Sequence, residues 1–138
     1  MTIIDMKVMR YINLLDQVSR VKTSKCFIHN NTIFFAVKHR DVSRAIGPAA
    51  INIRKMNQSI SSKIKIINEA EGLYDAKRFI EDIVAPLRIK SLEVQDNNLI
   101  ITAGNSQTKA SLFGRNKKRF EELKTIVHDN FGLALKII

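Results

Sequence analysis

The chain has 138 residues, which is room for one ordinary domain or two small ones. Hydrophobic residues make up 45% and charged residues 26%, a balance that excludes a disordered chain. Lys and Arg total 23 against 13 Asp and Glu, and the net charge of +10 favours a polyanionic partner such as nucleic acid, an anionic membrane surface or an acidic protein. A basic protein without such a partner can have the same composition, so charge alone does not identify the partner.

Several features favour a cytoplasmic protein. Cys26 is the single cysteine, so no internal disulfide can form and a reducing compartment fits. It lies in the apolar run Cys26–Ile28, which predicts a small core residue. No apolar run approaches the roughly 20 residues of a membrane span. Met1–Arg10 carries Asp5 and Lys7 among isolated apolar residues, and we therefore expect no signal peptide.

The first half of the chain predicts the order helix, strand, strand, helix, helix, strand. Apolar residues recur at helical spacing in the first segment, and Asn30-Asn31 separates two apolar runs as a tight-turn signal. The predicted elements are a helix over 5–19, strands over 25–29 and 32–37, a short helix capped by Asp41 or Ser43 and ending near Gly47, a helix over 49–58, and a strand over 63–66. The strand over 33–37 is apolar on both faces, which predicts a central, buried position.

The second half predicts the same order. Asp96-Asn97-Asn98 supplies the turn between its first two strands, and Asn130–Gly132 precedes its last strand. The predicted elements are a helix over 75–84 capped by Asp75 and ended by Pro86, strands over 87–94 and 99–103, a short helix over 106–113 ended by Gly114, a helix over 116–129, and a strand over 133–138.

Matched positions in the two halves indicate an internal repeat. Lys65-Ile66-Ile67 matches Lys136-Ile137-Ile138 on an offset of 71. We predict two modules, residues 1–70 and 71–138, and the short link between them favours a rigid pair. The pairs that share an offset of 67 are Gly47 and Gly114, Ile53 and Phe120, Met56 and Leu123, Ile60 and Val127, and Ile33 and Ile100.

Each half contains a helix, a break at glycine and a second helix. Glycine allows a sharp turn and a close approach of the backbone to phosphate, and the following helix presents free N–H groups. The segments 44–56 (RAIGPAAINIRKM) and 111–120 (SLFGRNKKRF) resemble the helix–GXXG–helix segment of KH modules. Residues 76–86 (AKRFIEDIVAP) resemble the inter-domain helix of NusA proteins, which ends in a similar Ala-Pro pair.

The chain thus resembles archaeal NusA-like transcription factors, which are little more than two KH modules. The resemblance implies an α+β fold of two tandem type II KH modules, each α-β-β-α-α-β, packed as one rigid unit. It implies binding of single-stranded RNA and a role in transcription termination or antitermination with RNA polymerase. The alternatives are a ribosome-associated or RNA-processing KH protein, and a protein-interaction module whose degenerate loops no longer bind RNA.

The RNA-binding residues are expected around the two glycines. Neither loop is a full GXXG, because Ala50 and Lys117 hold the fourth positions. The positive charge also differs, since Arg54-Lys55 is replaced by Glu121-Glu122 in the second copy. We predict that the second copy holds phosphate through its loop side chains, and the first through Arg44, Arg54 and Lys55. The full set of expected RNA-binding residues is Arg44, Ile46, Gly47, Pro48, Ala49, Ala50, Arg54, Lys55, Phe113, Gly114, Arg115, Asn116, Lys117 and Lys118.

The same glycines could instead be simple helix C-caps. Lys38-His39-Arg40 could contact phosphate or be a solvated loop. Phe34, Phe35 and Phe113 could stack on bases or pack in the core, whereas the spacing of Phe120 favours the core.

Enzyme chemistry has little support in the sequence. The histidines His29, His39 and His128 have no ligand partners at metal-binding spacing, and Cys26 lacks the polar surroundings of a nucleophile. No P-loop or dinucleotide fingerprint is present. We therefore expect no catalytic residue, metal, cofactor, small-molecule substrate or membrane partner.

Overall fold

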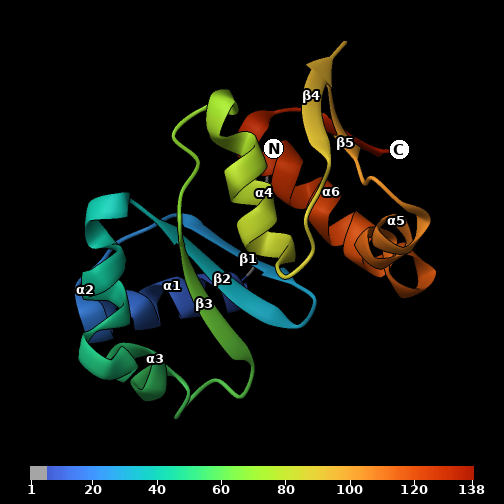
Figure 1. Cartoon of the computed structure of the whole chain (residues 1–138). Helices are drawn as coiled ribbons and strands as arrows, with labels where there is room; N and C mark the ends of the chain where they lie inside the picture. Colours follow the sequence, from blue (N-terminus) through green and yellow to red (C-terminus); the bar gives the residue numbers. More distant parts are fainter. Residues whose placement is uncertain (1–5) are drawn as a thin grey trace. The chain divides into compact units, whose positions relative to one another are not determined.

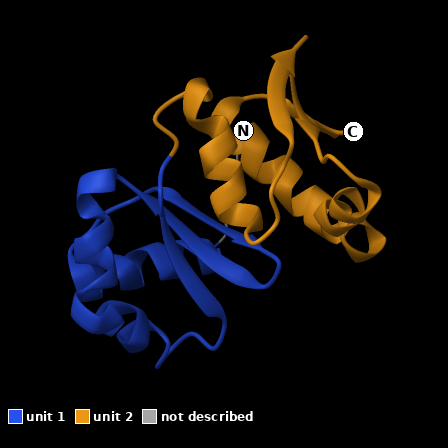
Figure 2. Cartoon of the chain, in the orientation of Figure 1, with its two compact units in different colours: residues 1–69 blue, residues 70–138 orange. Residues whose placement is uncertain are grey.

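The computed structural model describes residues 6–138 and divides into two compact units, Met1–Glu69 and Ala70–Ile138 (Figures 1 and 2). Each unit is α+β and follows the order helix, strand, strand, helix, helix, strand, with one-turn 3₁₀ segments between some elements. The first helix was predicted from Asp5, which lies outside the described residues.

Unit 1 is a three-stranded sheet with helices packed against it. Its elements are α1 (Met6–Ser19), β1 (Lys25–His29), β2 (Thr32–Val37), α2 (Val42–Ile46), α3 (Ile51–Met56) and β3 (Lys63–Asn68). β1 pairs antiparallel with β2 through a turn in which Asn30 and Asn31 both have positive φ. β3 pairs parallel with β2, so β2 is the central strand. Its residues 33–37 are all buried, which confirms the sequence prediction.

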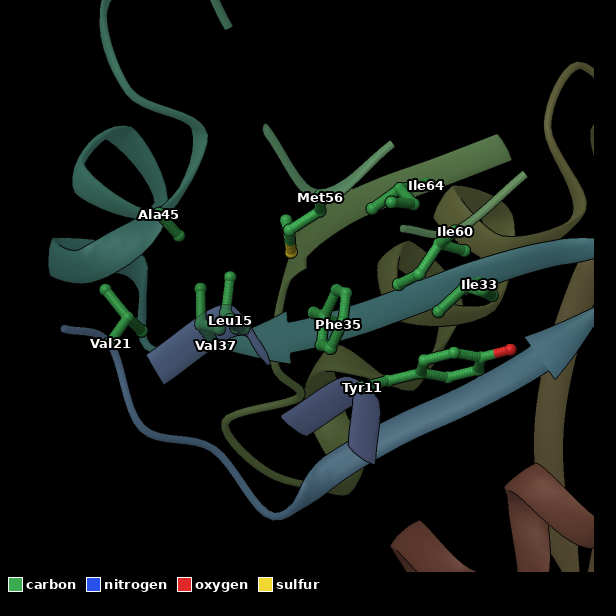
Figure 3. Close-up of a cluster of buried hydrophobic side chains, with 10 residues drawn as sticks. All are labelled: Tyr11, Leu15, Val21, Ile33, Phe35, Val37, Ala45, Met56, Ile60 and Ile64. Atoms are coloured by element: carbon green, nitrogen blue, oxygen red, sulfur yellow. The ribbon is translucent and has the colours of Figure 1, made fainter. Parts of the chain in front are cut away.

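The core of unit 1 forms between β2 and the helices (Figure 3). Alternate residues of a strand point to one face, and Ile33, Phe35 and Val37 of β2 therefore enter the same cluster. Leu15 of α1 and Met56 of α3 are fully buried against them. The half-buried Cys26 packs on this cluster, as expected for a small core residue.

Unit 2 repeats this layout with a shorter first helix and longer second and third helices. Its elements are α4 (Ala76–Val84), β4 (Ser91–Gln95), β5 (Asn98–Thr102), α5 (Ser106–Phe113), α6 (Lys118–Phe131) and β6 (Ala134–Ile137). Asp96 and Asn97 make the positive-φ turn between the antiparallel β4 and β5, and β6 pairs parallel with β5. Phe79 of α4 and Leu123 of α6 are fully buried.

Asp41 and Asp75 stand at the predicted N-cap positions, but neither side chain makes the expected capping hydrogen bond. The Asp41 carboxylate instead accepts a hydrogen bond from Arg44 at 3.1 Å. Asp75 precedes α4 but does not cap it either. Arg78 donates to both oxygens of Asp75, at 2.6 and 3.2 Å. This hydrogen bonding lowers the pKa of the Asp75 carboxyl.

Three predicted boundaries also differ. The helices predicted over 49–58 and 116–129 begin only at Ile51 and Lys118, because the two residues before each start have positive φ. The strand predicted from Leu87 begins only at Ser91. In the segment before it, the Ile89 N–H donates to the Glu81 carboxylate at 3.1 Å instead of to a strand.

The structure refines the repeat. The two hairpin turns start at Asn30 and Asp96, an offset of 66, so the predicted match of Ile33 with Ile100 is wrong by one residue. Ile33 corresponds to Leu99, and these residues pair with Ile64 and Leu135 on the parallel strand. That register agrees with the offset of 71 for the last strands.

Candidate nucleic-acid interface

The two glycine-led loops have the same backbone conformation. We name them loop 1 (Gly47–Ala50) and loop 2 (Gly114–Lys117). Each begins with a glycine at positive φ and extended ψ, and its third and fourth residues are both left-handed. The φ and ψ values are 79° and 162° for Gly47, 53° and 32° for Ala49, 58° and 32° for Ala50, 72° and 179° for Gly114, 55° and 29° for Asn116, and 59° and 23° for Lys117.

Both loop glycines are required where they stand. Positive φ with extended ψ is a region that essentially only glycine occupies. A Cβ at Gly47 would lie 2.8 Å from Ile51 Cγ2, and a Cβ at Gly114 would lie 2.7 Å from Arg119 Cγ. Each glycine also closes the preceding helix, since its N–H donates to the carbonyl four residues back. Both glycines are therefore helix C-caps, and their role in an RNA-binding loop stays a prediction.

A side chain crosses each loop at the same position. The Asn52 Nδ2 donates to the Arg44 carbonyl at 3.0 Å, and Arg119 Nη1 donates to the Ser111 carbonyl at 3.4 Å. Asn52 is only 8% exposed, an unusual position for an amide. Sequence reasoning missed both contacts, although an asparagine between Ile51 and Ile53 in an otherwise apolar helical turn was a usable signal.

The cations of unit 1 are partly engaged within the unit. Arg44 is paired with Asp41. Arg54 donates to the Ala49 carbonyl inside loop 1. Lys55 is exposed beside them, and Pro48 removes one backbone donor from the loop.

Three cations lie on loop 2 or directly after it. Arg115, Lys117 and Lys118 are all exposed. Within the part of the chain that the structure describes, their side chains form no hydrogen bond or ion pair. Unit 2 thus presents three unengaged positive charges on and directly after its loop.

The apolar residues beside the loops also differ. Phe113 and Phe120 are half-buried and stack on one another, with ring centroids 5.0 Å apart and 20° between planes. The prediction that Phe120 lies in the core is therefore wrong in part. The equivalent positions in unit 1 are Ile46 and Ile53. Phe34 and Phe35 are almost wholly buried, which excludes them as open base-stacking platforms.

The other groups considered in the sequence are Cys26, possible metal ligands and Lys38-His39-Arg40. Burial raises the pKa of the Cys26 thiol to about 12, so the reactive thiolate is not formed near neutral pH. Among residues 6–138, no three His, Cys, Asp or Glu side chains gather as a metal site. Lys38, His39 and Arg40 are exposed after β2.

No helix in the described range combines the length and the apolar character needed to cross a membrane.

Comparison with known proteins gives a consistent relationship. No family model matches the chain. It is 24% identical over 131 residues to the "Probable transcription termination protein NusA" of Methanocaldococcus jannaschii, covering 92% of this chain and 70% of that protein. Proteins of the same name match from Methanococcus vannielii, at 28% identity over 65% of this chain, and from Halococcus morrhuae, at 20% over 64%. These matches span 51% and 62% of those two relatives.

The fold has a solved counterpart. The structure titled "Crystal structure of APE1850" superposes with a TM-score of 0.66 at 19% identity, covering 98% of this chain and all of that chain. The chain is therefore similar over 92% of its length to one archaeal protein named probable NusA, and over 65% and 64% of its length to two others of that name.

Proposed function

We propose that the chain is a tandem type II KH protein that binds single-stranded RNA. The observation that carries the proposal is the repeated loop: two glycine-led turns with the same left-handed backbone, each between two helices and beside exposed cations. KH modules clamp about four nucleotides at such a loop. The net charge of +10 provides the long-range attraction to phosphate.

The proposed RNA-binding residues surround loops 1 and 2. Backbone at the glycines approaches the phosphates, neighbouring cations neutralise them, and the apolar residues next to the loops contact bases. The set is Arg44, Ile46, Gly47, Pro48, Ala49, Ala50, Arg54, Lys55, Phe113, Gly114, Arg115, Asn116, Lys117 and Lys118.

Titration against a short single-stranded RNA and the matching duplex, over a range of salt, tests this function. We expect tighter binding of the single strand, with log K falling by about 0.7 per neutralised phosphate for each decade of salt. In an Arg115→Ala/Lys117→Ala variant the slope should fall by about 1.4, because each cation contacts one phosphate. Fluorescence anisotropy at several salt concentrations measures both quantities.

A matched control is Lys90→Ala/Lys136→Ala, which removes the same charge from exposed positions of unit 2 outside loop 2. This control should keep the wild-type slope to within about 0.3, since neither lysine contacts a phosphate. Equal binding of single strand and duplex would contradict the KH assignment and leave only general attraction to polyanions. An unchanged slope in the loop variant would remove Arg115 and Lys117 from the site.

We also propose, from the similarity to the archaeal proteins, that this RNA binding serves RNA polymerase during elongation and termination. The tagged chain, isolated from its native cells after nuclease treatment, is expected to retain RNA polymerase subunits. Immunoblotting against polymerase and ribosomal proteins distinguishes the alternatives. Recovery of ribosomal subunits in place of polymerase would instead favour a ribosome-associated role.

A further inference from the structure

Loops 1 and 2 both require an element that holds them in place. Each contains two consecutive left-handed residues other than glycine, namely Ala49-Ala50 and Asn116-Lys117. Such residues persist only where the surrounding structure enforces them. Only short-range backbone hydrogen bonds close each turn. In loop 1 the Ala50 N–H donates to the Gly47 carbonyl at 3.1 Å and the Ile51 N–H to the Pro48 carbonyl. The equivalent bonds of loop 2 run from Lys117 to Gly114, at 3.3 Å, and from Lys118 to Arg115.

The crossing side chains supply that restraint in the same way in both units. Each arises five residues after the loop glycine and donates to the carbonyl three residues before it, so it ties together the helices on either side. Each also packs against the glycine itself, because a Cβ there would lie within 3.0 Å of its atoms. The amide of Asn52 in unit 1 and the guanidinium of Arg119 in unit 2 thus make equivalent contacts.

We propose that Asn52 and Arg119 are equivalent positioning residues. Arg119 supports RNA binding by holding the conformation of loop 2, and not by neutralising a phosphate. This inference rests on the proposed RNA-binding function. Arg119 is half-buried with its chain folded over Gly114, unlike the exposed Arg115, Lys117 and Lys118. Asn52 demonstrates that a neutral amide makes the same contact from the equivalent backbone position.

The test compares Arg119→Ala with Arg119→Asn, which transplants the unit 1 brace into unit 2. Arg119→Ala should weaken single-stranded RNA binding about fivefold, the effect of one ordinary hydrogen bond. Arg119→Asn should restore the affinity to within about twofold, and neither variant should change the salt slope. Val127→Ala in the core of α6 is the stability control, and it should bind RNA like the wild type.

Hydrogen exchange of the Lys117 amide, which donates to the Gly114 carbonyl, reports the brace without RNA. This amide should exchange faster in Arg119→Ala and at the wild-type rate in Arg119→Asn. A wild-type chain that binds no single-stranded RNA would refute the proposed function, and the exchange rates alone would then decide the brace.

Three results would overturn the inference. Equal losses in both Arg119 variants, with a slope lower by about 0.7, would make Arg119 a phosphate ligand. Wild-type RNA affinity and a wild-type exchange rate in Arg119→Ala would show that the Arg119 contact does not hold loop 2 in place. An equal affinity loss in Val127→Ala would reduce the effect to general stability.

Discussion

Gly114→Asp should lose at least about tenfold in affinity for single-stranded RNA. The glycine has a φ of 72° and a ψ of 179°, a region that a residue with a Cβ enters only at a cost of about 1–3 kcal/mol. The new Cβ would also lie 2.7 Å from Arg119 Cγ, so loop 2 must change shape. The added carboxylate repels phosphate as well. Fluorescence anisotropy with the RNA used above measures the loss.

Gly132→Asp is the matched control for this variant. Gly132 also has a positive φ, at 68°, but its ψ of 22° places it in the left-handed region that Asp tolerates. A Cβ there meets nothing within 4 Å. The two variants carry the same change in net charge, so they differ only in the position of the new carboxylate and in its effect on the geometry of loop 2. Equal RNA affinity of Gly114→Asp and Gly132→Asp would show that loop 2 has no part in binding.

Phe35→Ala should leave unit 1 largely unfolded. Phe35 is fully buried at the centre of β2, among the side chains of Figure 3. Truncating a buried phenylalanine costs about 3–5 kcal/mol. A single core of this size rarely supplies more than about 3–5 kcal/mol in total, so the loss equals the stability of the unit. Urea unfolding followed by circular dichroism and amide NMR measures the change.

Tyr74→Ala provides the comparison, because it removes an aromatic ring that is 82% exposed. Its hydroxyl donates to Glu71, and Tyr74 belongs to unit 2, so in this variant unit 1 should unfold at the wild-type urea concentration. A Phe35→Ala variant that unfolds at the same urea concentration as Tyr74→Ala would mean that the central strand contributes little to the stability of unit 1.

The sequence predicted the fold correctly where the intrinsic preference of a residue matches the backbone conformation that it adopts. Asparagine tolerates positive φ, and Asn30-Asn31 therefore marked a real turn. The apolar run over 33–37 marked the buried central strand. Gly47 and Gly114 marked both loops, because no other residue fits their conformation.

The sequence failed where tertiary contacts overrule local preference. Alanine is the strongest helix former, so Ala49 and Ala50 were assigned to a helix, whereas both are left-handed in loop 1. The Asn52 contact depends on two helices meeting across the loop, and periodicity carries no information about that. The bond from Arg54 to the Ala49 carbonyl was likewise beyond the reach of the charge pattern, and Arg54 stays a predicted phosphate contact.

In the two loops, the residues that fix the backbone conformation are not the residues that carry the charge. Glycine torsions and a crossing side chain fix the path of the backbone, while the charge near it differs between the copies: the exposed Arg54 of unit 1 is replaced by the exposed Glu121 in unit 2. Surface residues of this kind usually change with little effect on folding. Natural selection can therefore retune the affinity of either copy through single exposed substitutions, without rebuilding the unit that carries it.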